Sequence, residues 1–189
     1  MRKVTAGLFL SLDGVTESPE KWQLPYYDDE MGEAVGAALA AADAMLLGRV
    51  TYQEFASYWP GVSAEEEPFA GYMNNTPKYV VSRSLEGPLE WNNSTLIKGN
   101  LVEEISRLKR QPGKNIGITG SVTLVQSLLQ KDLLDELGLM IHPAIVGRGK
   151  RIFEGWGEPK GLTLVDSKTF STGVVYLTYR PAGKKEEGS

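Results

Sequence analysis

The sequence lacks cysteine altogether and has a single histidine, His142, among its 189 residues. The absence of cysteine excludes a disulfide framework, a thiolate nucleophile, a zinc–cysteine site and an iron–sulfur cluster. One imidazole is too few for a multi-histidine metal site, and a Ser-His-Asp catalytic triad could use only His142. We expect no bound metal. If the protein is an enzyme, its catalytic groups are carboxylates, hydroxyls, main-chain groups or a cofactor.

The sequence also lacks an excess of charge of one sign and any long apolar run. It has 20 Lys and Arg against 24 Asp and Glu, which gives a formal net charge of −4. A broad nucleic-acid surface normally leaves a basic excess, and a membrane span needs about 18 consecutive apolar residues. We therefore expect neither a nucleic-acid partner nor a membrane partner. The first residues show no signal-peptide pattern, which favours a cytoplasmic protein.

What the sequence does contain is an alternation of strand and helix patterns. Apolar residues at period two predict a first strand from Val4 to Leu12, ending in a turn at Asp13 and Gly14. Helical spacing from Met31 to Ala42 follows, with acidic residues in its first turn. Further strands are predicted over 44–47, 79–82, 95–98, 115–119 and 137–141, further helices over 51–58, 101–108 and from 121, and an antiparallel pair over 162–169 and 173–180.

This order of elements predicts a single three-layer α/β domain over residues 1–181. Its sheet is expected to be mixed and mostly parallel, closed by the C-terminal antiparallel strand pair. The short charged segment 182–189 is predicted to be a flexible tail.

Three of the predicted strands end in Gly, Ser or Arg: Gly48-Arg49, Ser82-Arg83 and Gly120-Ser121. The carboxyl ends of parallel strands are where α/β proteins bind ligands, and helix N-termini there suit phosphate. Arginine adds bidentate phosphate binding. Each pair alone could be a tight turn or a helix cap, but the three together favour a ligand with several phosphates. The P-loop and Rossmann glycine patterns are absent.

Five segments occur in an order that is typical of one superfamily. They are Ser11-Leu-Asp-Gly14, Asp43-Ala-Met-Leu-Leu-Gly-Arg-Val-Thr-Tyr52, Tyr79-Val-Val-Ser-Arg83, Ile118-Thr-Gly-Ser121 and Pro143-Ala-Ile-Val-Gly-Arg-Gly149. The chain resembles the dihydrofolate reductase-like superfamily over residues 3–180. It is most similar to the bacterial branch that includes the C-terminal reductase domain of the bifunctional riboflavin-biosynthesis deaminase/reductase. The resemblance implies the three-layer dihydrofolate reductase-like fold and NADPH as cofactor.

The resemblance also implies residues that bind the cofactor, in three groups. Gly48, Arg49 and Thr51 would bind its pyrophosphate and 2′-phosphate end. Ser82 and Arg83 would bind the region of the adenosine 2′-phosphate. Gly120, Ser121 and Val122 would direct main-chain N–H groups at the pyrophosphate. The family often has two glycines in this last loop, and Ser121 replaces the second.

On the substrate side the resemblance implies a catalytic Asp13 near the nicotinamide, with formation of the turn as its alternative role. A second catalytic acid would lie at the start of the first helix. We name Asp29, although Asp28, Glu30 and Glu33 are alternatives that spacing does not separate. Trp22 is expected to form a wall of the pocket or a packed lid. The loop residues Gly147, Arg148 and Gly149 would bind a substrate phosphate or form a solvated turn.

The function implied is NADPH-dependent reduction of a small pyrimidine- or pterin-like substrate by hydride transfer, as in 5-amino-6-(5-phosphoribosylamino)uracil reductase. A deaminase half is excluded, because its zinc would need cysteines. Two alternatives remain: a non-catalytic NADPH-binding or sensor domain, and a classical dihydrofolate reductase. The resemblance further implies a homodimer, with the C-terminal strands as the candidate interface.

Overall fold

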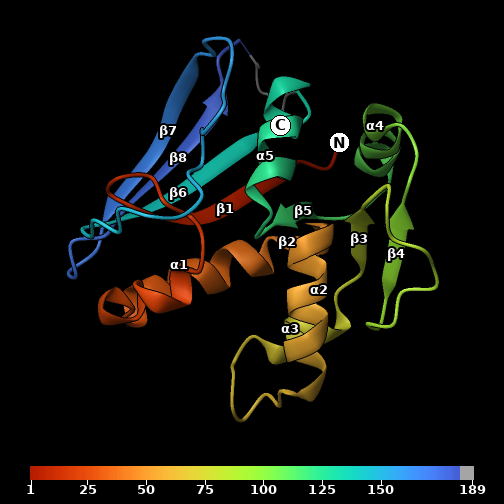
Figure 1. The fold of residues 1–189 in the computed structure, drawn as a ribbon, viewed down its shortest axis with the longest axis horizontal. Helices are drawn as coiled ribbons and strands as arrows, with labels where there is room; N and C mark the ends of the chain where they lie inside the picture. Colours follow the sequence, from red (N-terminus) through yellow and green to blue (C-terminus); the bar gives the residue numbers. More distant parts are fainter. Residues whose placement is uncertain (184–189) are drawn as a thin grey trace.

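The computed structural model describes residues 1–183, which build one eight-stranded sheet in the order β4-β3-β2-β5-β1-β6-β8-β7 (Figure 1). The strands are β1 (Val4–Ser11), β2 (Ala42–Gly48), β3 (Lys78–Val81), β4 (Ser94–Ile97), β5 (Asn115–Ile118), β6 (Glu136–His142), β7 (Leu162–Thr169) and β8 (Val175–Pro181). The first six run parallel, and β8 is antiparallel to both β6 and β7. This is the mixed, mostly parallel α/β sheet with an antiparallel C-terminal pair that the sequence predicts.

Five α-helices cover the two faces of the sheet, α4 and α5 on one face and α1, α2 and α3 on the other (Figure 1). They are α1 (Asp29–Ala40), α2 (Arg49–Tyr58), α3 (Ala70–Asn75), α4 (Leu101–Arg110) and α5 (Val122–Gln130). Short 3₁₀ helices lie at Pro19–Lys21, Leu24–Tyr26 and Trp59–Gly61. Side chains cap three of the α-helices at their N-termini, namely those of Asp28, Asn100 and Ser121.

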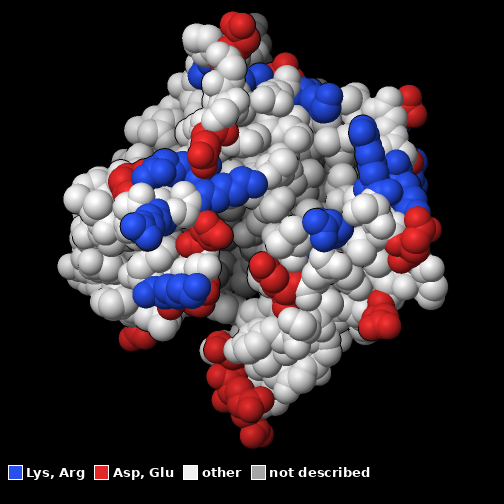
Figure 2. Space-filling view, viewed as in Figure 1, with Lys and Arg blue, Asp and Glu red and all other residues white. Residues whose placement is uncertain are grey.

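The two faces of the sheet are packed differently. The face under α4 and α5 has one continuous core, to which β1, β2, β5 and β6 all contribute. The other face has two separate clusters. One lies under α2 and α3 around Met45 and Leu47, and the other lies under α1 around Met31 and Met140. In the space-filling view a hollow lies in the middle of the molecule, with Lys and Arg side chains on its left border (Figure 2).

Three details differ from the sequence-based prediction. β1 ends at Ser11, and Leu12 is 65% exposed, because the chain turns there and the Leu12 N–H donates to Ala144 O instead of continuing the strand. Ala42 is the first residue of β2 and does not belong to α1. The short helix α3 was not predicted; it has no capping side chain and is held by the burial of Ala70 and Met73. Of the predicted tail, residues 184–189 lie outside the described residues.

Among residues 1–183, no helix is long and apolar enough to cross a membrane. The same residues contain no group of three or more His, Asp or Glu side chains that could hold a metal ion.

Candidate active site

Gly7 of β1 leaves open space in the middle of the sheet, on the face that carries α1, α2 and α3, and we refer to this space as the cleft. β5 pairs with β1 only as far as Ala6, so within residues 1–183 the stretch of β1 from Gly7 onward has β6 as its only neighbouring strand. Gly7 is exposed although it lies in a central strand, and a Cβ added there would meet nothing within 4 Å. A glycine inside a strand often marks a place where a ligand approaches the backbone. Gly7 is not among the site residues predicted from the sequence, although a glycine inside a strand pattern is visible there.

The helix α1, on the same face of the sheet, is packed on the sheet only in part. Only Met31 of its twelve residues is buried, and Ala38, which belongs to its predicted apolar face, is exposed. A helix that packed fully on the sheet would bury a continuous stripe. Part of the predicted apolar face of α1 is therefore exposed to solvent.

Two helix N-termini meet at one edge of this cleft. Gly48 precedes α2 and Ser121 caps α5, accepting a hydrogen bond from the Leu124 N–H at 3.4 Å. A Cβ at Gly48 would lie 2.5 Å from Ser121 Oγ, and a Cβ at Gly120 would lie 3.0 Å from Thr51 Oγ1. Both positions therefore need glycine so that the two loops can approach. The unpaired N–H groups of two first helical turns are gathered here, an arrangement that suits an anion such as a pyrophosphate.

The remaining predicted cofactor residues lie on the same edge of the sheet. Gly48 pairs with Val81, so Ser82 and Arg83 follow directly beside the start of α2. The buried Ser82 Oγ accepts the N–H of Leu85 at 3.0 Å and shapes the turn after β3. Arg49 is exposed, and its Nη1 donates to Gln53 Oε1 at 2.9 Å. Val122 is half-buried as the first residue of α5. The structure thus brings together the three strand ends selected from the sequence.

Asp13, just after β1, is hydrogen-bonded to the loop that follows β6. Its Oδ1 accepts the Ser11 hydroxyl at 2.7 Å and the Val146 N–H at 3.0 Å, and its Oδ2 accepts the Gly147 N–H at 2.9 Å. These donors hold the pKa of the Asp13 carboxyl well below its usual range, the Ser11 hydroxyl contributing most. Arg151 lies 3.5 Å from Oδ2. Asp13 is therefore an ionised carboxylate that positions a loop.

The loop that Asp13 holds contains Gly147, Arg148 and Gly149. The two glycines have φ angles of +78° and +120°, which favour glycine. A Cβ at Gly149 would come within 2.8 Å of Val15 Cγ1. The loop is also bonded to the segment after β1, because the Lys150 N–H donates to Glu17 Oε2 at 2.9 Å. Arg148 is exposed between the two glycines.

The acids at the start of α1 face a different part of the molecule. Asp28 caps Met31 and accepts the Ser171 hydroxyl at 3.0 Å, and Glu30 accepts the Ser171 N–H at 3.1 Å. Both therefore engage the turn between β7 and β8. Asp29, the acid named from the sequence, is exposed at the first position of α1. The hydrogen bonds of Ser171 involve neither Asp29 nor Glu33, which is also exposed.

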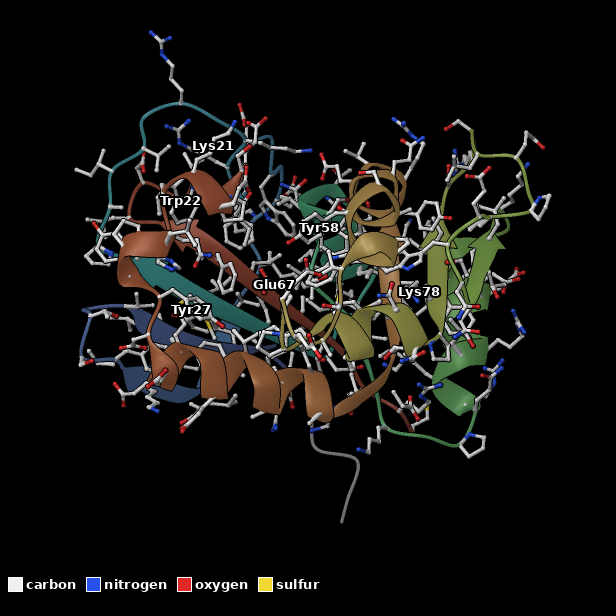
Figure 3. The ribbon with its side chains drawn as sticks, turned by 90° about the horizontal axis from the view of Figure 1, so that it is seen from below. Lys21, Trp22, Tyr27, Tyr58, Glu67 and Lys78 are labelled. Carbon is white, nitrogen blue, oxygen red and sulfur yellow. The ribbon has the colours of Figure 1, made fainter. Side chains whose placement is uncertain are left out.

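Aromatic residues from two parts of the chain lie on the side of the molecule seen in Figure 3. Trp22 and Tyr27 come from the segment before α1, and Tyr58 and Glu67 come from the α2–α3 side. Burial raises the pKa of the Tyr27 hydroxyl, and the negative charge of Glu67 raises it further. These two parts of the chain are therefore close enough to interact electrostatically. Of these residues, sequence reasoning selected Trp22 as part of the site.

Comparison with known proteins identifies the family. Residues 2–176 match the RibD C-terminal domain, a range that includes every residue of the candidate site. The chain belongs to the RibD C-terminal domain family. The resemblance inferred from the five sequence segments is thereby confirmed.

Two relatives of this RibD C-terminal domain protein come from Bacillus subtilis (strain 168). The uncharacterized protein YyaP is 31% identical over 184 residues, which is 94% of each chain. The uncharacterized protein YwjB is 24% identical over 176 residues, 92% of this chain and 95% of YwjB.

Several solved structures have the same fold as this RibD C-terminal domain. A putative riboflavin biosynthesis protein from Shewanella sp. PV-4 has a TM-score of 0.76 at 21% identity, covering 96% of this chain and 99% of that one. The diaminohydroxyphosphoribosylaminopyrimidine deaminase/5-amino-6-(5-phosphoribosylamino)uracil reductase of Thermotoga maritima has a TM-score of 0.69 at 18% identity, covering 96% of this chain and 57% of that one. A pyrimidine reductase-like protein from Corynebacterium diphtheriae has a TM-score of 0.66 at 14% identity, covering 97% of this chain and 93% of that one.

Proposed function

We propose that this protein is an NADPH-dependent reductase that transfers hydride to a small, pyrimidine-like heterocycle. The observation that carries the proposal is the contact of two helix N-termini through Gly48 and Gly120, beside the cleft at Gly7. The family, and solved relatives described as a reductase and as pyrimidine reductase-like, support the reaction type. NADPH would supply the hydride, and the protein would supply binding and orientation.

The cofactor's phosphates are assigned to the edge where β3, β2 and β5 end. The N–H groups at the starts of α2 and α5, around Gly48 and Ser121, would bind the pyrophosphate. Arg49 and Arg83, both exposed at neighbouring strand ends, would bind the 2′-phosphate. That phosphate distinguishes NADPH from NADH, so the two arginines should carry the preference.

The experiment that tests this proposal compares the two cofactors on arginine variants. Arg49→Ala and Arg83→Ala should each weaken NADPH binding by about tenfold or more, since a hydrogen bond between charged groups contributes about 1.5–3 kcal/mol. NADH binding should change little. Arg110→Ala, which removes an exposed arginine at the far end of α4, is the matched control. Equal losses for NADPH and NADH in the Arg49 and Arg83 variants would refute the assignment.

The substrate is assigned to the side of the cleft bordered by Trp22 and the loop of Gly147, Arg148 and Gly149. Arg148 would bind a substrate phosphate, and Asp13 would hold the loop in place through its bonds to Val146 and Gly147. Both oxygens of Asp13 accept hydrogen bonds from Ser11 and the loop, so the proton for reduction is assigned to the second acid named from the sequence, Asp29, or to water. Asp29→Asn should lower turnover with NADPH affinity nearly intact, if Asp29 is the donor.

A second candidate function is NADPH binding without turnover. It is favoured by one observation, the engagement of Asp13 in loop contacts that leave it without a proton. Oxidation of NADPH in the presence of pyrimidine, pterin and quinone-like acceptors separates the two functions. A reductase oxidises NADPH with at least one of these acceptors, whereas a sensor binds it and oxidises none.

A further inference from the structure

The only histidine of the chain, His142, lies completely buried at the end of β6, behind Trp22. The rings of Phe9, Trp22 and Tyr26 pack edge-to-face around its imidazole, with centroids at 5.8, 5.3 and 6.0 Å. His142 pairs with Ser11 on β1, in the stretch that has no β5 neighbour. A polar ring is thus enclosed by three aromatic rings at the carboxyl end of β6.

The hydrogen bonds of His142 determine its tautomer. Nδ1 lies 3.0 Å from Met140 O and 3.2 Å from Leu10 O, and carbonyl oxygens accept hydrogen bonds only. Nδ1 therefore carries the proton. Burial lowers the pKa of the imidazole, which keeps the ring neutral. In a neutral ring with Nδ1 protonated, Nε2 is a pure acceptor.

That acceptor has no donor. His142 Nε2 is buried and makes no hydrogen bond within residues 1–183, and the same holds for Gln23 Oε1, next in sequence to Trp22. Nε2 is not the ring nitrogen that bonds the strand carbonyls, and the imidazole that carries it is surrounded by the rings of Phe9, Trp22 and Tyr26. Buried acceptors are normally paired, and an exception calls for a partner that the protein itself does not supply.

The segment that carries Trp22, which we call the cover of His142, is lightly attached. The 3₁₀ helices Pro19–Lys21 and Leu24–Tyr26, on either side of Trp22, bury none of their residues. Trp22 Nε1 donates within its own segment, to Glu17 O at 3.1 Å, and the Tyr26 hydroxyl reaches Pro143 O at 3.3 Å. Displacing Trp22 therefore breaks few contacts with the rest of the protein.

We propose that His142 Nε2 accepts a hydrogen bond from an N–H or O–H group of the molecule bound in the cleft, and that Trp22 moves to admit it. The inference rests on the proposed function and narrows the substrate to planar heterocycles that present a donor, such as a ring N–H or an amino group. His142 acts here as a binding residue, because a neutral Nε2 has no proton to transfer.

Having one histidine makes the test unambiguous. Untagged protein labelled with ¹⁵N-histidine gives one Nδ1 and one Nε2 resonance, observed with uracil and with 1,3-dimethyluracil as probes. Uracil and its dimethyl derivative share a ring, but only uracil has N–H donors. Uracil should move the Nε2 resonance upfield by several parts per million, and 1,3-dimethyluracil should not. Absence of a shift with uracil up to its solubility limit, or equal shifts with both, overturns the proposal.

A second measurement tests the cover without a ligand. Diethylpyrocarbonate modifies neutral imidazole, and Trp22→Ala should accelerate the modification of His142 about tenfold or more. Tyr58→Ala, which removes an exposed aromatic ring from the α2–α3 side, is the control and should leave the rate unchanged. Equal rates in wild type and Trp22→Ala would show that Trp22 is not the cover.

Variants of His142 complete the design. His142→Phe keeps a ring among the three aromatic rings and removes the acceptor, so uracil affinity should fall about tenfold, the order of one hydrogen bond. Unchanged affinity in this variant overturns the proposal. NADPH binding is measured on the same samples. If NADPH binds but uracil causes no Nε2 shift, the role of His142 is rejected and the proposed reductase function is not. An Nε2 shift with uracil in a protein that does not bind NADPH rejects the proposed reductase function, while the binding role of His142 stands.

Discussion

The contact between Gly48 and Ser121 allows a quantitative test of the site by a double-mutant cycle. In Gly48→Ala the new Cβ would lie 2.5 Å from Ser121 Oγ and 3.2 Å from Ser121 Cβ. The Ser121 side chain has little freedom to yield, because it caps α5 through the Leu124 N–H. Forcing one methyl group into a packed site costs about 1–3 kcal/mol. We therefore expect Gly48→Ala to lower the free energy of unfolding by that amount.

Removing the opposing side chain should relieve the clash. Ser121→Gly alone loses the cap, but glycine at an N-cap costs only a few tenths of a kcal/mol. The double variant Gly48→Ala/Ser121→Gly has room for the added methyl group. Its unfolding free energy should return to within about 1 kcal/mol of wild type, which gives a coupling energy of about 1–3 kcal/mol between the positions.

The assay is urea unfolding of the wild type, both single variants and the double variant, with NADPH affinity measured on each. NADPH affinity should fall in Gly48→Ala and recover in the double variant. Gly36→Ala is the control, since its Cβ would meet Phe69 at an ordinary 3.7 Å and helix propensity favours alanine. Additive effects of the two substitutions would show that Gly48 and Ser121 do not pack as described, and would remove the observation that carries the proposed function.

Three further predictions follow from other parts of the structure. Burial lowers the pKa of the Lys78 ammonium from 10.5 to about 8. The unfolded state therefore binds this proton more tightly than the folded state does. The free energy of unfolding should rise as the pH increases from about 8 towards 10.5, by up to about 3 kcal/mol. Thermal unfolding across this range should show the rise in wild type and not in Lys78→Met, and a fall in wild type would contradict it. Gly7→Val should keep the fold, because its Cβ meets open space, yet reduce NADPH affinity at least about tenfold in a fluorescence titration; unchanged affinity would show that ligands do not lie over Gly7. Leu164→Lys, on the exposed edge strand β7, should convert the homodimer expected from the family resemblance to monomer in sedimentation, and a monomeric wild type would reject that interface.

The sequence predicted the sheet and its covering helices well because their signals are local. Period-two and helical spacings mark β1, β8 and α5 directly, and Ser121 caps α5 as its position indicated. The helix α3 was missed because six residues without a capping side chain carry little local signal, and its stability comes from tertiary burial.

The site was predicted less completely, since its geometry depends on residues far apart in the sequence. The residues at the three strand ends were identified, because glycine and arginine after apolar strands have a local meaning. The partners of Asp13 are Val146 and Gly147, more than 130 positions away, and spacing around Asp13 does not reveal them. Spacing likewise gave no sign that Asp28 and Glu30 engage Ser171, or that His142 lies behind Trp22.

The face of the sheet covered by α1, α2 and α3 has two separate clusters, and this division has a consequence for how the molecule responds to its ligand. A continuous core would place a side chain on β1 where Gly7 leaves open space between the cluster around Met31 and the cluster around Leu47. Each cluster can then open in its own local unfolding event, with its own level of amide-exchange protection. A molecule bound over Gly7 touches both clusters and takes the place of the missing side chain. It joins two separately packed units into one cooperative unit, whose free energy of unfolding rises with the logarithm of the ligand concentration above the dissociation constant.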